Sequence, residues 1–270
     1  MPPLVANRRL AKAAAAELAV VPLASQTLLG LDLDPDRPGR AGRVTTLLRC
    51  GLRDPDGREP PWRRVHRASL KQRLQWLLAL CRRTGLGQLS LRCRCPHCAA
   101  ELELAMALPA DQDQADAAPA TVDCEPAPGV RLRLRLPTGE DQSRWASRNS
   151  TDAAAMARDL VIAVDAGGPG AEGGDRLDPA WLSAIGESLE AADPLTALEL
   201  HSGCPDCGAA LALPVDLERL LLQWLGSRQS GLLFDVHRLA SAYHWGEREI
   251  AALDPRRRAF YLGCLEREGR

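Results

Sequence analysis

Two short copies of one pattern, Cys-Pro-x-Cys, carry the side chains of this sequence that could do chemistry. The first copy spans Cys95–Cys98 and the second spans Cys204–Cys207. Apolar and polar residues alternate on both sides of each copy, which predicts two half-buried strands joined by a tight turn. Two such hairpins can place four thiolates around one tetrahedral zinc ion, the ligand set of structural zinc ribbons. The predicted ligands of a structural zinc are Cys95, Cys98, Cys204 and Cys207.

A redox dithiol is the main alternative for these cysteines, because Cys-Pro-His-Cys also occurs as the active-site dithiol of disulfide oxidases. In those sites the first cysteine begins a helix, whose dipole lowers the pKa of the thiol. The residues after Cys98 alternate as in a strand, and a second copy at Cys204 has no role in a single-site oxidoreductase. The pattern therefore favours metal binding over redox chemistry. Free cysteines or a lost site are a third interpretation.

The two halves of the predicted site lie far apart in the chain. Cys95 and Cys204 are 109 positions apart, so a large insertion must separate the hairpins and long-range contacts must close the site. Cys93 could replace a ligand, but we interpret it as a spare thiol, and we interpret His97 and His201 as neighbours of the site. The other cysteines have no partner at metal spacing and are interpreted as small apolar fillers or surface thiols: Cys50, Cys81, Cys124 and Cys264.

Composition limits the classes of function. The chain has 270 residues, of which 46% are hydrophobic but only 4% aromatic, so its core must consist mostly of Leu, Ala and Val. A net charge of −1 provides no global positive field for nucleic acid or anionic lipid. No apolar run reaches the roughly 18–20 residues of a membrane span. Nine cysteines with two metal-type pairs fit a reducing compartment. We therefore expect a cytoplasmic protein with no membrane partner, and nucleic acid is disfavoured as a partner.

No catalytic constellation is recognisable in the sequence. Neither a Ser-His-Asp set nor paired carboxylates in a plausible pocket can be assembled. The glycine-rich stretch 167–174 lacks the Lys-Ser/Thr of a phosphate loop. A zinc with four thiolate ligands leaves no position for a substrate. We therefore expect no enzyme activity and no small-molecule substrate.

Hydrophobic periodicity and turn residues predict the elements of the first half of the chain. These are, in order, an alanine-rich helix at 5–20, a loop or linker at 32–61 with one short ordered piece at 44–48, a helix from Ser69 to Thr84-Gly85, a mobile low-complexity segment at 111–128, a strand at 130–136, and a helix capped by Thr138. The strand carries leucines on one face and arginines on the other. Its arginines could form a basic ridge for an acidic partner, but a solvated sheet face is favoured.

The second half is predicted to be mainly helical. The expected elements are a helix at 152–164, a flexible link at 167–174, a helix from Asp178-Pro179 to about Ala192, and a helix at 217–225 broken at Gly226. They are followed by a second helix at 232–243, a turn at 244–246, a short helix containing Ile250 and Leu253, and a last helix beginning at Asp254-Pro255. The arginines at 256–258 could meet a partner carboxylate, but solvent exposure is favoured. The predicted core or interface residues are Trp224, Leu233, Tyr243, Trp245 and Tyr261.

These elements predict an α+β fold, in which a mainly helical chain surrounds a small antiparallel zinc-ribbon-like β module made of the two Cys-Pro-x-Cys hairpins. Three units are expected. Residues 1–65 form an N-terminal helix and a linker rich in Pro, Gly and Arg. Residues 66–216 form the zinc-ribbon-like domain, with a helical insertion at about 110–194. Residues 217–270 form a C-terminal helical domain.

The order of these motifs resembles the baseplate hub assembly chaperones of contractile-tailed phages and related contractile injection systems. The resemblance covers roughly residues 66–265. It rests on an upstream leucine-rich helix, Cys95–Cys98 with Glu101–Glu103, Arg133–Thr138, Ala192–Pro194, Cys204–Gly208, His237–Ala240, Tyr243–Trp245, Glu249-Ile250, Leu253 and Arg256–Arg258. The resemblance implies a non-catalytic assembly factor that binds baseplate hub or spike proteins and helps them to join the baseplate.

Three other functions remain open at this point. The first is a nucleic-acid-binding regulator, in which zinc ribbons act with a helix-turn-helix-like tail and its three arginines; the near-neutral charge weighs against it. The second is a thiol-disulfide enzyme. The third is a structural component that stays in the mature particle.

Overall fold

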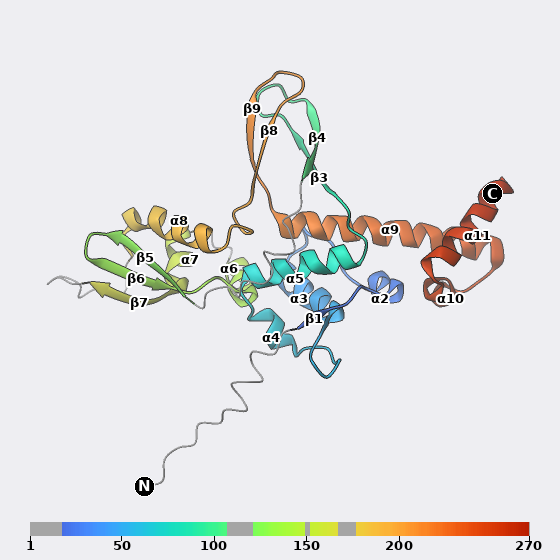
Figure 1. Ribbon diagram of the computed structural model, residues 1–270, viewed down its shortest axis with the longest axis horizontal. Helices are drawn as coiled ribbons and strands as arrows, with labels where there is room; N and C mark the ends of the chain where they lie inside the picture. Colours follow the sequence, from blue (N-terminus) through green and yellow to red (C-terminus); the bar gives the residue numbers. More distant parts are fainter. Residues whose placement is uncertain (1–17, 107–120, 149–151, 167–176, 270) are drawn as a thin grey trace, which may run out of the picture.

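The computed structural model describes residues 18–106, 121–148, 152–166 and 177–269. Its elements extend in different directions from a central helical body (Figure 1). Two β-hairpins stand together above the body. A small sheet with two helices lies at one end, and two short helices lie at the other end, beyond the longest helix. The fold is α+β with small antiparallel sheets, as predicted.

The elements follow one another along the chain as labelled in Figure 1. Up to the first hairpin they are β1 Ala19–Val20, α2 Ser25–Leu29, α3 Arg40–Gly51, β2 Leu52–Arg53, α4 Trp62–His66, α5 Leu70–Arg83, β3 Leu89–Arg94 and β4 Glu101–Met106. After it come β5 Val122–Ala127, β6 Val130–Leu134, α6 Gly139–Ser147, α7 Ala153–Leu160, β7 Val161–Ala166, η2 Pro179–Trp181, α8 Leu182–Ala192, β8 Glu199–Gly203, β9 Ala210–Pro214, α9 Leu217–Tyr243, α10 Glu247–Ala252 and α11 Pro255–Arg267.

The central body is built from α3, α5 and the first half of α9, which share one buried leucine-rich cluster. Leu47, Leu77 and Leu221 come from the three predicted units and all lie in this cluster. The units therefore share a core, and the boundaries between them stay a prediction. The helix predicted from Ser69 is confirmed as α5. The Ser69 side chain accepts a hydrogen bond from the backbone N–H of Gln72, which caps the helix.

The prediction of a loop or linker at 32–61 is wrong, because Arg40–Gly51 forms the twelve-residue helix α3. Its apolar stripe consists of few residues, and proline- and glycine-rich stretches flank it. The periodicity was therefore visible only around Val44 and Leu48, which are both completely buried. The helix α3 is stabilised by packing its apolar residues against α5, a contact that the local sequence does not reveal.

A buried arginine links the central helices. The guanidinium of Arg73 donates to Thr45 Oγ1 at 2.8 Å, to the carbonyl oxygen of Ala41 at 2.8 Å and to that of Val65 at 3.1 Å. Gly139, the first residue of α6, lies directly against this guanidinium, since a Cβ built there would be 2.7 Å from Arg73 Cζ. Arg73 therefore connects α3 and the end of α4, and leaves room only for glycine at the start of α6.

The insertion between the hairpins is a lobe with its own small core. Its three-stranded antiparallel sheet has the order β5-β6-β7, and α8 packs against it. The strand predicted at 130–136 is confirmed: Leu132 and Leu134 are buried while Arg131 and Arg133 are exposed. A capping box at Thr138 and Asp141 starts α6, which confirms the predicted cap.

Two expectations for this insertion need correction. It is not simply helical, because residues 122–127, predicted as part of a mobile segment, form β5. Residues 161–164, predicted as the end of the helix at 152–164, belong to the strand β7. In β7 the β-branched residues Val161, Ile162 and Val164 favour a strand, and β6 supplies the neighbouring backbone groups. The positions 111–120 and the glycine-rich stretch 167–174 lie outside the described residues, as does the predicted helix at 5–20 up to residue 17.

The C-terminal arm is the outer part of α9 together with α10 and α11 (Figure 1). The predicted break at Gly226 is wrong, because Leu217–Tyr243 is one continuous helix of 27 residues. A helical glycine costs only about 1 kcal/mol relative to alanine, and burial of Leu225 and Leu232 on either side outweighs this cost. The predicted turn after Tyr243 is confirmed, with His244 in a left-handed conformation at φ 58°.

None of the helices in the described part of the chain combines the length and the apolar character that crossing a membrane requires.

Candidate metal centre

Each Cys-Pro-x-Cys copy forms the tip of an antiparallel hairpin. In the first hairpin β3 pairs with β4, and the last pair before the tip joins Arg94 and Glu101. In the second hairpin β8 pairs with β9, and the last pair joins Gly203 and Ala210. The local alternation of apolar and polar residues thus produced the expected strand, turn and strand in both copies.

The two tips have the same backbone geometry. The N–H of Cys95 donates to the carbonyl oxygen of Ala100 at 2.9 Å, and the N–H of Cys204 donates to that of Ala209 at 2.9 Å. The residue after each second cysteine, Ala99 or Gly208, has a left-handed backbone and donates back to the first cysteine's carbonyl oxygen. The internal repeat is therefore one of structure as well as sequence.

The hairpin tips meet and bring all four predicted sulfurs together. These atoms lie within 4.8 Å of one another, although the pairs are 109 positions apart in the chain. Cys95 Sγ is 3.8 Å from Cys207 Sγ, and Cys98 Sγ is 3.7 Å from Cys204 Sγ. All four cysteines are free. Four sulfurs at about 2.3 Å from a tetrahedral zinc would be about 3.8 Å apart, so the spacing fits such an ion. The group is therefore close enough to hold a metal ion.

The hairpins are held at both ends. At their bases Leu89, Met106 and Val215 belong to the buried cluster of the central body. At their tips Leu102 and Leu211 pack with Cys95 and Cys204 in a separate small cluster. The body fixes where the hairpins begin, whereas the tips depend on a few apolar contacts and on the four thiols.

The pKa values of three of these thiols, Cys95, Cys98 and Cys207, are shifted in different directions. Burial alone would raise the pKa of Cys95, but the backbone N–H groups of Cys98 and His97 donate to its sulfur and, with the neighbouring thiols, lower the pKa to about 6. The backbone N–H of Ala100 acts to lower the pKa of Cys98, but burial and the surrounding thiols raise it to about 12. Likewise the N–H of Ala209 acts to lower the pKa of Cys207, but the Cys204 thiol and burial raise it. A cation at the centre would take the place of these protons, because metals bind thiolates.

The side chains beside the site do not belong to the cluster of four. Within the described residues, the group that could hold a metal comprises only the four tip cysteines, so Cys93, His97 and His201 lie outside it. Cys93 pairs with Leu102 within the hairpin and packs at the edge of the tip cluster. His201 Nε2 lies 3.2 Å from a carboxylate oxygen of Glu199. These positions agree with the interpretation of the three residues as neighbours.

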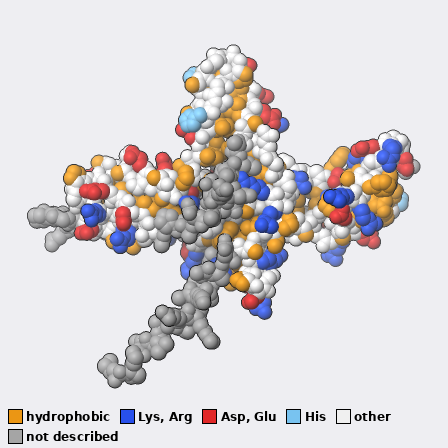
Figure 2. All heavy atoms as spheres, viewed as in Figure 1, with side chains coloured by type: hydrophobic (Ala, Val, Ile, Leu, Met, Phe, Trp, Pro, Cys, Tyr) orange, Lys and Arg blue, Asp and Glu red, His pale blue; other side chains and the backbone are white. Residues whose placement is uncertain are grey.

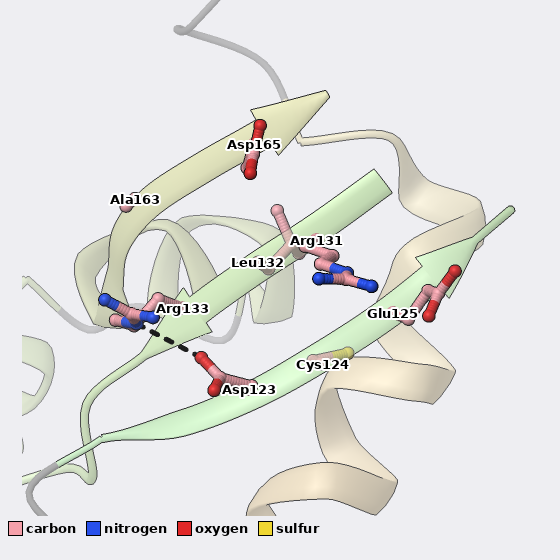
Figure 3. A pocket seen from close by; sticks show the side chains of 8 residues that line it. All are labelled: Asp123, Cys124, Glu125, Arg131, Leu132, Arg133, Ala163 and Asp165. Carbon is pink, nitrogen blue, oxygen red and sulfur yellow. Dashed lines mark hydrogen bonds and ion pairs between the residues drawn. The ribbon is translucent and has the colours of Figure 1, made fainter. Parts of the chain in front are cut away.

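A second feature, a hollow of about 630 Å³ on the open face of the β5-β6-β7 sheet, was not predicted from the sequence. Figure 3 shows that acidic side chains from β5 and β7 surround the two arginines of β6. Arg133 forms an ion pair with Asp123 at 3.1 Å, and Glu125 and Asp165 lie beside Arg131. The arginines therefore form no separate basic ridge, because the adjacent strands supply opposite charge on the same face.

Comparisons of the chain with known protein families, with characterised proteins and with solved structures found no match.

Proposed function

We propose that the chain is a non-catalytic assembly factor for the baseplate hub or spike of a contractile tail or injection system, and that it folds around a structural zinc ion. In this proposal the two hairpins form a zinc-ribbon-like module and Cys95, Cys98, Cys204 and Cys207 are the ligands. The zinc maintains the fold, and the surfaces of the lobes around it bind the partner proteins.

The spacing and chemistry of the four sulfurs support zinc as the metal. A cluster of four soft thiolates in tetrahedral spacing suits zinc better than calcium or magnesium, which prefer oxygen ligands. With four protein ligands a zinc ion has no open position, which is the arrangement of structural rather than catalytic sites. Structural zinc contributes apparent binding free energies of about 10–16 kcal/mol in small zinc-finger peptides.

The observation that carries the assembly role is that the two Cys-Pro-x-Cys tips, which both belong to the family resemblance, meet at one point. Further pieces of the resemblance lie on other parts of the molecule (Figure 1): the leucine-rich helix is α5 in the central body, and the motifs between His237 and Arg258 fall on or next to α9, α10 and α11. Several small cores around one body suit a protein that offers separate surfaces to other proteins.

The assembly role is tested by co-expression with candidate hub and spike proteins of a contractile tail. We expect affinity purification of the tagged chain to recover a hub or spike protein, and deletion of its gene to yield particles without a complete hub. A Cys98→Ser/Cys207→Ser variant should fail to restore assembly, whereas Cys93→Ser should restore it. Normal incorporation of hub and spike in the deletion strain would contradict the role.

The salt dependence of DNA binding distinguishes an assembly factor from the alternative function, a nucleic-acid-binding regulator. Phosphate contacts make binding steeply salt-dependent. If the protein is an assembly factor, we expect no retention of the zinc-loaded protein on immobilised duplex DNA even at 50 mM salt. Retention that falls steeply with salt would favour the regulator instead.

A further inference from the structure

The aromatic residues of the chain are concentrated in the C-terminal arm. The whole sequence contains only two Phe and two Tyr, and all four lie between residues 234 and 261. The rings of Tyr243 and Trp245 stack at 4.8 Å, and Tyr261 meets Trp245 edge-on at 4.9 Å. Phe260 lies at the end of this series, 5.8 Å from Tyr261, and is 63% exposed. A supported row of rings thus ends in one ring that faces solvent.

Two arginines that form no ion pair within the described residues lie beside Phe260. Of the three consecutive arginines that begin α11, Arg258 forms an ion pair with Asp235 at 3.3 Å and is largely buried. Within the described residues no carboxylate pairs with Arg256 or Arg257. The nearest acid in sequence, Asp254, caps α11 by accepting from the backbone N–H of Arg256. The unpaired positive charge of α11 is therefore next to its exposed ring.

These side chains enclose a shallow hollow. A volume of about 210 Å³ is lined by Arg256, Arg257, Phe260 and Tyr261, which we call the α11 surface. Figure 2 shows orange and blue side chains side by side over this end of the molecule. Aromatic and arginine side chains contribute most of the binding free energy in many protein interfaces, where the ring fills a pocket and the guanidinium pairs with a carboxylate.

We propose that the α11 surface docks an acidic segment of a partner protein that carries a large apolar side chain. The apolar side chain packs on Phe260 and Tyr261, and one or two carboxylates pair with Arg256 and Arg257. The inference deepens the proposed function and rests on it for the identity of the partner as an assembly client. Its own test does not require the hub or spike protein.

The charge distribution favours an acidic protein segment over nucleic acid. Two arginines match one or two carboxylates, whereas a nucleic-acid site must neutralise several phosphates along a strand. The chain as a whole has a net charge of −1 and provides no wider positive field. The apolar part of the surface is a ring supported from behind, which suits a Leu, Phe or Trp side chain.

The test is a selection of random twelve-residue peptides displayed on phage against the full-length, zinc-loaded protein. We expect the recovered peptides to combine Asp or Glu with Leu, Phe or Trp. For the strongest peptide, synthesised with a fluorescent label, Arg256→Glu/Arg257→Glu and Phe260→Ala should each raise the Kd about tenfold. Added salt should weaken binding to the wild type more than binding to the arginine variant.

Two matched controls keep the test specific. Arg131→Glu/Arg133→Glu makes the same change of charge on the distant sheet, and Phe234→Ala removes the other Phe, which is equally exposed at 63%. Both should leave the Kd within twofold, and all variants should remain folded and keep the wild-type zinc content. No enrichment of acidic peptides, equal weakening by the controls, or binding of labelled duplex DNA through Arg256 and Arg257 would overturn the proposal. If peptides bind here but no hub or spike protein co-purifies, only the assembly role fails.

Discussion

Ala99 and Gly208 occupy matching positions in the two hairpin tips, with left-handed backbones at φ 61° and 71°. A Cβ in this conformation costs about 1–2 kcal/mol, so the first tip carries backbone strain that the second avoids. No atom lies within 4 Å of a Cβ built on Gly208, so an alanine there would cause no clash. Substitutions at Ala99 and Gly208 therefore measure the free-energy cost of the left-handed backbone without a contribution from side-chain packing.

We expect Ala99→Gly to raise the free energy of unfolding by about 1 kcal/mol and Gly208→Ala to lower it by about as much. Denaturant unfolding of the zinc-loaded protein measures both changes. A destabilising Ala99→Gly would show that this residue does not have the left-handed conformation.

The ligand assignment makes a second prediction for individual residues. We expect one zinc ion per chain by elemental analysis, and loss of it in Cys98→Ser or Cys204→Ser. Because an incomplete site cannot hold the tips together, Cys204→Ser should be insoluble or partly unfolded. Cys93→Ser is the matched control, since Cys93 lies in the same hairpin but outside the cluster of four, and it should keep its zinc. Soluble, folded wild-type protein without metal would contradict the assignment.

The four sulfurs could be predicted from the sequence because each tip is set by local residue types. The alternation around each Cys-Pro-x-Cys copy predicts its hairpin without any long-range information. The meeting of the tips was inferred from thiolate chemistry, since nothing in the spacing of 109 positions encodes it. The sequence alone favours a spare thiol at Cys93 but leaves a ligand role open, and the structure places Cys93 in the strand β3, paired with Leu102 and outside the cluster of four.

At the scale of elements, errors arose where tertiary contacts decide the structure. The helix α3 has a narrow apolar stripe that needs the neighbouring helices, and α9 continues through Gly226 because residues on both sides are buried. The strand β7 needs β6 as its hydrogen-bonding partner. By contrast, α5 carries a local capping signal at Ser69, and its start was predicted correctly. The signal at Asp178-Pro179 starts the 3-10 turn η2, and α8 follows it only from Leu182.

The contact between α6 and the buried arginine makes a prediction at this scale. A Cβ at Gly139 would lie 2.7 Å from Arg73 Cζ and 2.8 Å from the carbonyl oxygen of His66. Because that carbonyl is backbone and the arginine is hydrogen-bonded, Gly139→Ala should destabilise the protein by about 1–3 kcal/mol. Gly186 is the control: it lies in α8 with no atom within 4 Å of its Cβ position. Gly186→Ala should stabilise by about 0.5–1 kcal/mol. Thermal unfolding of both variants checks that the melting temperature falls in Gly139→Ala and rises in Gly186→Ala.

At the scale of the whole molecule, the separate cores predict that parts of the protein can unfold independently. The tip cluster contains four buried residues, and two of them are Cys95 and Cys204 of the candidate metal site. The central cluster is much larger and includes only the bases of the hairpins. Loss of the metal should therefore affect the hairpins before the body.

We expect a chelator to remove hydrogen-exchange protection from the strands β3, β4, β8 and β9, while α5 and the first half of α9 stay protected. Native-state hydrogen exchange with and without the chelator measures this, and restored protection after added zinc is the control. Loss of protection throughout the molecule would contradict the independence of the two cores. Unchanged hairpins would contradict a structural role for the metal.

The distance along the chain between the two Cys-Pro-x-Cys copies also determines when the complete set of four thiols becomes available during synthesis. A ribosome releases Cys95 and Cys98 well before Cys204 and Cys207, since 109 positions separate the pairs. Until the second pair emerges, the nascent polypeptide contains only two of the four clustered thiols, Cys95 and Cys98, which is half of a four-ligand site. If the four thiols hold one metal ion, as we propose, its loading must wait until the intervening lobe has been made. A chain truncated before Cys204 then cannot acquire the ion in its final coordination.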